Sequence, residues 1–139
     1  MSSALSVIVP TCGRPDLLDA ALKSLRGSLR DGDELIVAES GSPDPEPVWE
    51  VARKHGARLI VVDAPGVSRA RNTGWREATH DLIAFVDDDV RVRPGWAAAM
   101  AAGLDAHPGA AFVSGRVDLP EGQGTLSLTV KSELAEEEY

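Results

Sequence analysis

Three consecutive carboxylates, Asp87, Asp88 and Asp89, are the strongest chemical signal in this sequence. They directly follow an apolar run at residues 82–86, which has the composition of a buried strand. Adjacent carboxylates repel one another, so at the mouth of such a strand they call for a compensating cation. If the chain stays extended, Asp87 and Asp89 point to the same side and favour a hard divalent ion, Mg²⁺ or Mn²⁺, shared with substrate phosphates. The alternative is an acidic turn that caps the next element.

Polar residues follow the other apolar runs as well. Arg14 lies near a predicted helix start, where a cation is unfavourable unless an anion binds there. Arg71 lies close to another helix start and is a possible phosphate ligand. Glu39 could accept a hydrogen bond from a ribose hydroxyl or a base N–H. In the alternative interpretation, these are a solvated loop arginine, a helix surface residue and part of a polar turn.

The elements that must position these residues are short strands and amphipathic helices in alternation. Apolar runs rich in Val and Ile predict strands at residues 5–9, 35–38, 59–62, 82–86 and 110–113. Stripes with a 3.6-residue period predict helices within residues 17–25, 48–55, 70–78 and 96–104. The alternation predicts an α/β fold, a mostly parallel sheet with helices on both faces. In such a sheet ligands bind beyond the carboxyl ends of the strands, where the polar residues fall.

The composition argues against several classes of function. The 139 residues suit one domain, and 43% of them are hydrophobic, which is enough for a core. The formal net charge of -8 argues against a nucleic-acid partner. A single cysteine, Cys12, excludes an internal disulfide. The sequence shows neither a signal peptide nor a transmembrane run, so we expect a cytoplasmic protein.

Four segments, in order, resemble the motifs of the family 2 glycosyltransferases, whose nucleotide-sugar domain has the GT-A fold. Ser6–Arg14 is similar to the family's first strand and its Pro-Thr-Tyr-Asn-Arg loop. Leu35–Asp44 resembles the second strand with its Asp-Asp-Gly-Ser-x-Asp loop. Val67–Gly74 matches the Ala-Arg-Asn-x-Gly element, and Ile83–Asp89 matches the strand that carries the D-x-D metal motif. The resemblance covers residues 5 to about 117 and implies a GT-A-like fold.

The resemblance also implies roles for nucleotide-binding residues. Thr11 and Arg14 would border the nucleotide, and Arg71 would lie near the base or the phosphates. Glu39 takes the place of an aspartate that contacts the base, and it is one methylene longer. Cys12 and Gly13 replace the usual Tyr and Asn, which removes an aromatic ring that could stack on the base. The resemblance therefore does not specify which nucleotide is bound.

For the acidic triplet, the resemblance implies a metal site. Asp87 would contact the ribose or sugar and Asp88 would flank it. Asp89, together with Asp87, would ligate the Mn²⁺ or Mg²⁺ that bridges the diphosphate. Such an ion lets an acidic protein bind a dianionic donor, and it stabilises the charge on the departing diphosphate.

The implied function is transfer of a sugar from a nucleotide-diphosphate sugar to an unknown acceptor, with inversion. In inverting members a carboxylate base lies in a later, acceptor-binding half, and the sequence shows no such half. We therefore expect a truncated chain, with a nucleotide-sugar-binding domain at residues 1–117. Residues 118–139 would be the start of the acceptor region or an acidic tail, and residues 126–130 alternate like one more strand.

Two other functions stay open at this point. One is a non-catalytic module that binds a nucleotide sugar or a partner protein and lacks turnover because the acceptor half is absent. The other is a metal-dependent nucleotidyltransferase. That class needs a glycine-rich, basic loop after the first strand, and residues 10–15 offer only Gly13 and Arg14. Separately, a homo-oligomer or a completing domain is a possible partner of the chain.

Overall fold

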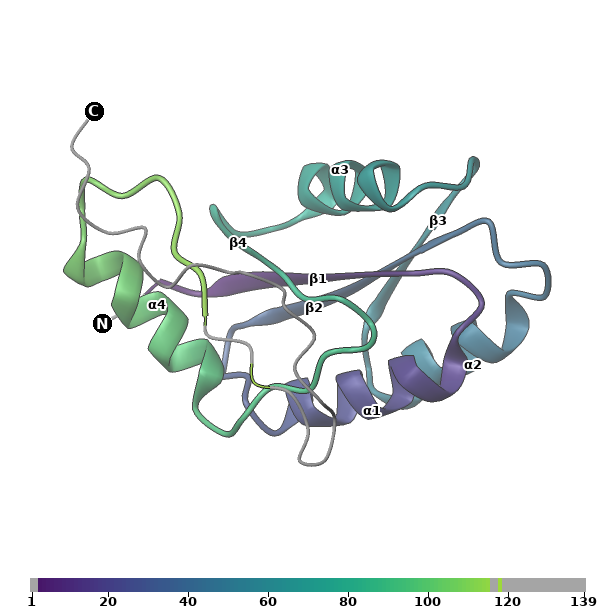
Figure 1. The fold of residues 1–139 in the computed structure, drawn as a ribbon, viewed down its shortest axis with the longest axis horizontal. Helices are drawn as coiled ribbons and strands as arrows, with labels where there is room; N and C mark the ends of the chain where they lie inside the picture. Colours follow the sequence, from purple (N-terminus) through teal and green to yellow (C-terminus); the bar gives the residue numbers. More distant parts are fainter. Residues whose placement is uncertain (1–2, 116–117, 119–139) are drawn as a thin grey trace.

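A computed structural model of the chain describes residues 3–115 and residue 118. Strands and helices alternate along it (Figure 1). In order they are β1 (Leu5–Thr11), α1 (Pro15–Arg26), β2 (Glu34–Ser40), α2 (Glu46–Lys54), β3 (Arg58–Val62), α3 (Val67–Glu77), β4 (Leu82–Phe85) and α4 (Trp96–Ala106). The α/β architecture, the first four predicted strands and the four predicted helices are confirmed.

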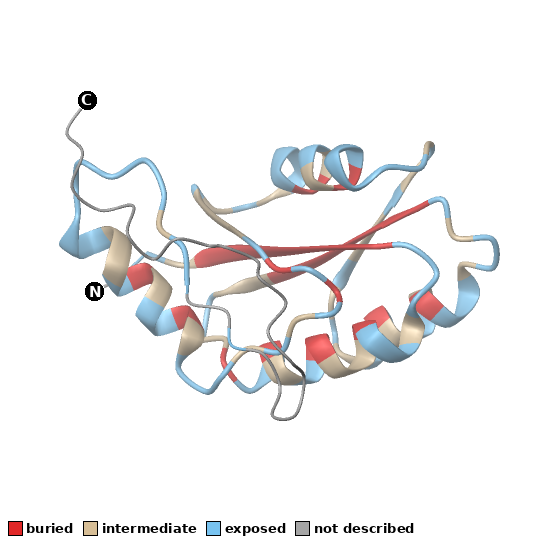
Figure 2. Ribbon diagram, in the orientation of Figure 1, coloured by how far each residue is buried: buried red, intermediate tan, exposed pale blue. Residues whose placement is uncertain are grey.

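The four strands form one parallel sheet in the order β3-β2-β1-β4. β1 and β2 lie at its centre, with Val9 opposite Val37, and they are the most deeply buried strands (Figure 2). Their nearly continuous apolar sequences suit strands that are covered on both faces. β3 and β4 are the edge strands.

Helices cover the two faces unequally. α1, α2 and α4 lie on one face and α3 lies alone on the other (Figure 1). The larger core contains residues of α1, α2 and α4, whereas the smaller one joins Ala70 of α3 to Ile8 and Ile36. Gly74 lets α3 approach the sheet, because a Cβ at this position would lie 2.6 Å from Cγ2 of Ile8.

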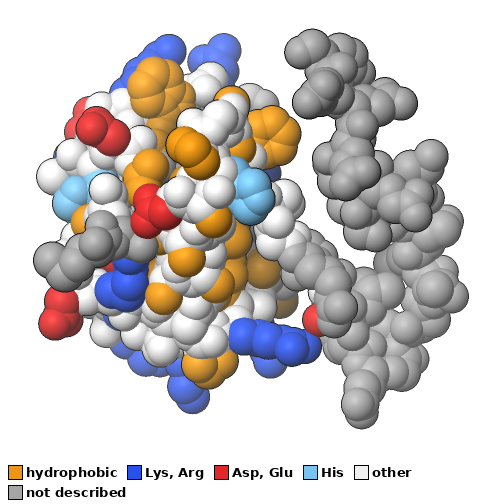
Figure 3. Space-filling model, turned by 90° about the vertical axis from the view of Figure 1, so that its left-hand side faces the viewer, with side chains coloured by type: hydrophobic (Ala, Val, Ile, Leu, Met, Phe, Trp, Pro, Cys, Tyr) orange, Lys and Arg blue, Asp and Glu red, His pale blue; other side chains and the backbone are white. Residues whose placement is uncertain are grey.

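The two ends of the sheet differ in their surface. Figure 3 shows the end at which the strands begin. Hydrophobic side chains run down the middle of this face, and its acidic side chains lie apart from one another. The loops that follow β1, β2 and β4 belong to the other end of the sheet (Figure 1). That end carries the residues that the sequence singles out.

The fifth predicted strand, at residues 110–113, is wrong. The segment has no strand structure, and the side chain of Phe112 is 81% exposed. An apolar run becomes a strand only when a neighbour supplies its hydrogen bonds, and no described strand pairs with this segment. The predicted strand at residues 126–130 and the tail lie outside the described residues. Within the described part of the chain, no helix is long and apolar enough to cross a membrane.

Candidate nucleotide-sugar site

The acidic triplet forms a turn at the end of β4. The N–H of Val86 donates to the carbonyl of Ile8 (3.0 Å), and the N–H of Val90 then donates to the carbonyl of Asp87 (3.1 Å). The chain therefore does not stay extended through Asp89, and the condition for placing Asp87 and Asp89 on one side of a strand is not met. The turn still separates the three side chains, because Asp87 and Asp89 are exposed and Asp88 is fully buried.

Asp88 binds groups at the end of β1. Its Oδ2 accepts hydrogen bonds from Oγ1 of Thr11 (2.9 Å) and Nε of Arg14 (3.1 Å), and its Oδ1 pairs with Nη2 of Arg14. This two-point contact is the strong form of an arginine–carboxylate pair. Thr11 is 4% exposed, whereas half of the Arg14 side chain is exposed. Asp88 thus fixes the acidic turn to the loop between β1 and α1.

This contact also explains why an arginine precedes a helix. The sequence suggested that an external anion offsets the unfavourable dipole of α1 at Arg14. In the structure, the carboxylate of Asp88 is an internal anion that pairs with this guanidinium. Ligand contact by Thr11, Arg14 and Asp88 stays a prediction, and in this conformation Asp88 has no surface to offer.

Asp87 and Asp89 have different surroundings. Oδ1 of Asp87 accepts a hydrogen bond from Nη2 of Arg71 at 2.8 Å, and both side chains are at least one-third exposed. Exposed pairs contribute only about 0–1 kcal/mol, so a ligand can compete for either partner. Asp89 makes no hydrogen bond or ion pair with the described residues. The turn therefore presents two carboxylates to solvent at the carboxyl end of β4.

Glu39, at the end of β2, is 3% exposed. Its Oε1 accepts the N–H of Ser42 (2.9 Å), and Oγ of Ser42 accepts the N–H of Gly13 (2.7 Å). These bonds connect the loops after β1 and β2. The sequence analysis did not assign a role to Ser42; a serine three residues after a strand-end carboxylate was the available signal.

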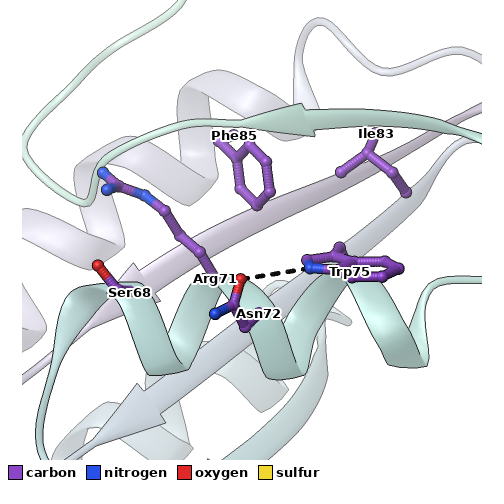
Figure 4. A pocket seen from close by; sticks show the side chains of 6 residues that line it. All are labelled: Ser68, Arg71, Asn72, Trp75, Ile83 and Phe85. Carbon is purple, nitrogen blue, oxygen red and sulfur yellow. Dashed lines mark hydrogen bonds between the residues drawn. The ribbon is translucent and has the colours of Figure 1, made fainter.

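A pocket of about 420 Å³ opens between α3 and β4. Figure 4 shows its lining, with Ser68, Arg71, Asn72 and Trp75 along the helix and Ile83 and Phe85 on the strand. The indole N–H of Trp75 donates to Oδ1 of Asn72 at 3.4 Å. Arg71 lines this pocket and also pairs with Asp87, so it links the pocket to the acidic turn.

The donors at the turn fit a hard divalent ion. Mg²⁺ binds through one or two carboxylates together with water and substrate phosphates, rather than through a complete protein cage. Asp87 and Asp89 supply two exposed carboxylates of this kind. The described residues contain no group of three metal-ligating side chains, so phosphate oxygens would have to complete the coordination.

Comparison with known proteins identifies the family. The model of the glycosyl transferase family 2 matches residues 6–133. The chain belongs to this family. The pre-mycofactocin glycosyltransferase of Mycobacterium tuberculosis is 33% identical over 127 residues, which are 88% of this chain and 26% of that protein. The validoxylamine A glucosyltransferase of Streptomyces hygroscopicus is 34% identical over 115 residues, or 77% of this chain and 26% of the relative.

Solved structures of other proteins show the same fold. Glucosyl-3-phosphoglycerate synthase from M. tuberculosis, solved with Mn²⁺, UDP and glucosyl-3-phosphoglycerate, aligns with a TM-score of 0.61 at 27% identity. The match covers 73% of this chain and 39% of the synthase. S. aureus TarS residues 1–349, in complex with UDP-GlcNAc, align with a TM-score of 0.64 at 24% identity over 76% of this chain. The chain spans less than half of the length of the relatives and structures named here.

Proposed function

We propose that this chain forms the donor-binding part of a glycosyltransferase that transfers a sugar from a nucleotide-diphosphate sugar. One observation carries the proposal. In a chain of glycosyl transferase family 2, the carboxyl end of β4 presents Asp87 and Asp89 to solvent while the intervening Asp88 is buried. Family membership supports sugar transfer, and the exposed pair supports a metal-bound diphosphate.

Asp87 and Asp89 would hold the divalent ion, Mn²⁺ or Mg²⁺. When bound, this ion would neutralise the diphosphate and stabilise the charge that develops on it as a leaving group. The complex of the related synthase with Mn²⁺ and UDP supports a divalent ion for this chain. Carboxylate oxygens also suit such an ion better than nitrogen or sulfur ligands would.

The remaining residues would bind and orient the donor. Arg71 can exchange its exposed pair with Asp87 for a phosphate oxygen or a base carbonyl, and Asp87 then becomes free for the metal. Arg14 offers the exposed half of its side chain to the nucleotide while Asp88 fixes its position. Glu39 holds the loop after β2 through Ser42 and would border the base.

We propose further that transfer inverts the anomeric centre and that a general base on the acceptor side deprotonates the attacking hydroxyl. We propose that the acceptor site and the base lie in an acceptor-binding part, since this chain matches only 26% of the length of the pre-mycofactocin glycosyltransferase.

Calorimetric titration tests donor binding. UDP, UDP-sugars, GDP and GDP-sugars are titrated with and without Mn²⁺ into the wild type, Asp89→Ala and Asp105→Ala. Asp105 is an exposed acid of α4 and makes no described contact, so its variant is a matched control. We expect binding that requires Mn²⁺, is at least about tenfold weaker in Asp89→Ala and is unchanged in Asp105→Ala. Metal-independent binding that both variants retain would contradict the proposed site.

A further inference from the structure

The segment between β4 and α4 carries the acidic turn but has no regular structure of its own. Residues 87–95 form neither a strand nor a helix, so no sheet ladder fixes their position. Val90 and Val92 pack against the larger core, whereas Arg91 and Arg93 are exposed. Apolar packing is not directional, so it decides which side of the segment faces the core but not where the segment lies along α1. Directional hydrogen bonds can set that position.

Two serines at the end of α1 supply such hydrogen bonds. The N–H of Val92 donates to Oγ of Ser24, which lies in the helix, at 3.0 Å. Oγ of Ser28, a buried residue just after the helix, donates to the carbonyl of Arg93 at 2.5 Å. The chain that follows β4 accordingly runs past α1 before α4 begins (Figure 1). These bonds hold two consecutive residues of the irregular segment against α1.

A second hydrogen bond orients the hydroxyl of Ser24. Its Oγ donates to the carbonyl of Ala21, within the same helix, at 2.7 Å. A hydroxyl has one proton and two lone pairs, so with its proton on Ala21 the oxygen of Ser24 presents a lone pair to the N–H of Val92. Alanine suits a helix interior better than serine does. The helix by itself therefore gives no reason for a hydroxyl at this position.

The acidic turn is thus fixed on both of its sides. Before Asp89, the carboxylate of Asp88 pairs with Arg14, which directly precedes α1. Three residues after Asp89, Ser24 holds Val92. The side chain of Asp89 makes no hydrogen bond or ion pair with the described residues, so its position depends on these two attachments. A functional side chain has to be held within about 0.5 Å of its productive position, which such supporting contacts achieve.

We propose that Ser24 is a positioning residue of the metal site and that Ser28 assists it. By accepting the N–H of Val92, the hydroxyl of Ser24 sets where Asp89 presents its carboxylate, without touching the ion or the donor. This role rests on the proposed donor site, because it takes Asp89 as a metal ligand. A divalent ion such as Mg²⁺ demands near-ideal coordination geometry, so a displaced Asp89 would bind it more weakly.

Hydrogen exchange followed by NMR tests the contact without any ligand. We expect the amide of Val92 to exchange about fivefold faster in Ser24→Ala than in the wild type, because its acceptor is lost. Ser6→Ala is the matched control. Oγ of Ser6, a buried residue at the other end of the sheet, likewise donates one hydrogen bond, to Glu34, and accepts another, from the N–H of His80. Val92 exchange that is equal in Ser24→Ala and the wild type would overturn the role of Ser24.

Electron paramagnetic resonance of Mn²⁺ in the presence of UDP or GDP tests the consequence for the metal. We expect Ser24→Ala to bind Mn²⁺ about fivefold more weakly than the wild type, and Ser24→Ala/Ser28→Ala more weakly still. Ser6→Ala should bind it as the wild type does, which separates positioning from a general loss of stability. Ser24→Thr keeps the hydroxyl and should restore both the Mn²⁺ affinity and the slow exchange of Val92. Circular dichroism confirms that each variant is folded.

The outcomes distinguish the role of Ser24 from the donor site itself. If the wild type binds Mn²⁺ and Ser24→Ala binds it equally well, Ser24 does not position the metal ligand and the donor site stands. Equal losses of affinity in Ser24→Ala and Ser6→Ala, or in Ser24→Ala and a folded Ser24→Thr, would also overturn the role of Ser24. A wild type that binds Mn²⁺ with neither nucleotide would instead contradict the proposed donor site, and the role of Ser24 would fall with it.

Discussion

Two acidic clusters lie at opposite ends of the sheet, and they use their carboxylates differently. At the end where the strands begin, Asp33 and Glu34 precede and open β2. At the other end, Asp87, Asp88 and Asp89 follow β4. Sequence composition alone does not separate these clusters, since both are runs of adjacent acids beside an apolar strand. In the structure the two clusters differ in the hydrogen-bond donors that contact each carboxylate.

The carboxylates at the start of β2 are saturated by the protein. Asp33 accepts the N–H groups of Leu5 (2.9 Å) and Arg30 (2.7 Å) and pairs with the Arg30 side chain. Glu34 accepts Oγ of Ser6 (2.7 Å) and both the N–H and the hydroxyl of Thr79. Burial alone would raise the pKa of both groups, but these hydrogen bonds outweigh it and lower the pKa of each. This cluster holds the sheet together.

Protein hydrogen-bond donors occupy the carboxylate oxygens of the triplet after β4 only in part. Asp88 resembles the first cluster, because it is buried and its oxygens meet Arg14 and Thr11. Asp87 and Asp89 remain exposed, and they are the carboxylates left for a ligand. One acid thus positions a turn whose other two acids face solvent. Removing a carboxylate of the first kind should cost stability, and removing one of the second kind should cost binding.

The largest expected effect on stability belongs to Asp33→Ala. The variant leaves two backbone N–H groups and a guanidinium without their acceptor, so we expect the free energy of unfolding to fall by about 3 kcal/mol. Urea denaturation measures this loss. Asp31→Ala, an exposed neighbour without a described partner, should change it by less than about 0.5 kcal/mol. Equal losses in the two variants would show that Asp33 does not hold the strands.

A smaller loss is expected for Asp88→Asn. The variant keeps the shape of the side chain but removes a buried charge from Arg14, which is half exposed and can turn toward water. We expect the free energy of unfolding to fall by about 1–2 kcal/mol. Asp89→Asn, its neighbour in the same turn, should leave stability unchanged in the same urea experiment. The comparison fails if Asp89→Asn destabilises the chain as much as Asp88→Asn does.

The pH dependence of stability tests the role of the acidic cluster at the start of β2. Because the pKa of Glu34 is lowered in the folded chain, its contribution is present above the ordinary carboxyl pKa and is lost as the pH falls through the lowered value. Wild type should exceed Glu34→Gln in stability at neutral pH, and the gap should close below about pH 4. Unfolding by urea at a series of pH values measures it. If the difference in stability between wild type and Glu34→Gln grows as the pH falls, the pKa of Glu34 is not lowered in the folded chain.

Among the carboxylates with an ion-pair partner discussed here, Asp87 should affect stability least when it is changed to Asn. Its pair with Arg71 is exposed on both sides, so the free energy of unfolding should change by less than about 1 kcal/mol. Thermal and urea unfolding both detect a change of this size. A loss comparable with that of Asp33→Ala would mean that the acidic turn depends on this pair and is not free to bind a ligand.

The sequence predicted the helices and the central strands because their patterns report burial directly. The run at residues 5–9 is apolar except for Ser6, and β1 is buried along its whole length. The run at residues 110–113 is also apolar, yet it has no strand structure, since composition does not reveal whether a partner strand is present. Pairing is a property of the assembled sheet and not of the segment.

For the candidate site, the sequence singled out residues at the strand ends but could not show how they pair. Asp88 and Arg14 are 74 positions apart, so no local pattern could show that they meet. The structure shows that Asp88 is one anion beside Arg14, and an additional contact of Arg14 with an external anion stays a prediction. The expectation that Asp87 and Asp89 face one way assumed an extended chain, whereas a turn exposes both. Their chemical type, carboxylates that directly follow the apolar run of β4, was readable from the sequence.

Electron paramagnetic resonance of Mn²⁺ tests most directly whether Asp87 and Asp89 bind the metal while Asp88 only positions the turn. The free Mn²⁺ signal is followed as protein is added in the presence of UDP, with UDP alone as the reference. If Asp87 and Asp89 hold the ion, the Asp87→Asn/Asp89→Asn variant will bind Mn²⁺ at least about tenfold more weakly than the wild type. Asp105→Asn will bind it as the wild type does. Equal binding by wild type and the double variant would contradict the account.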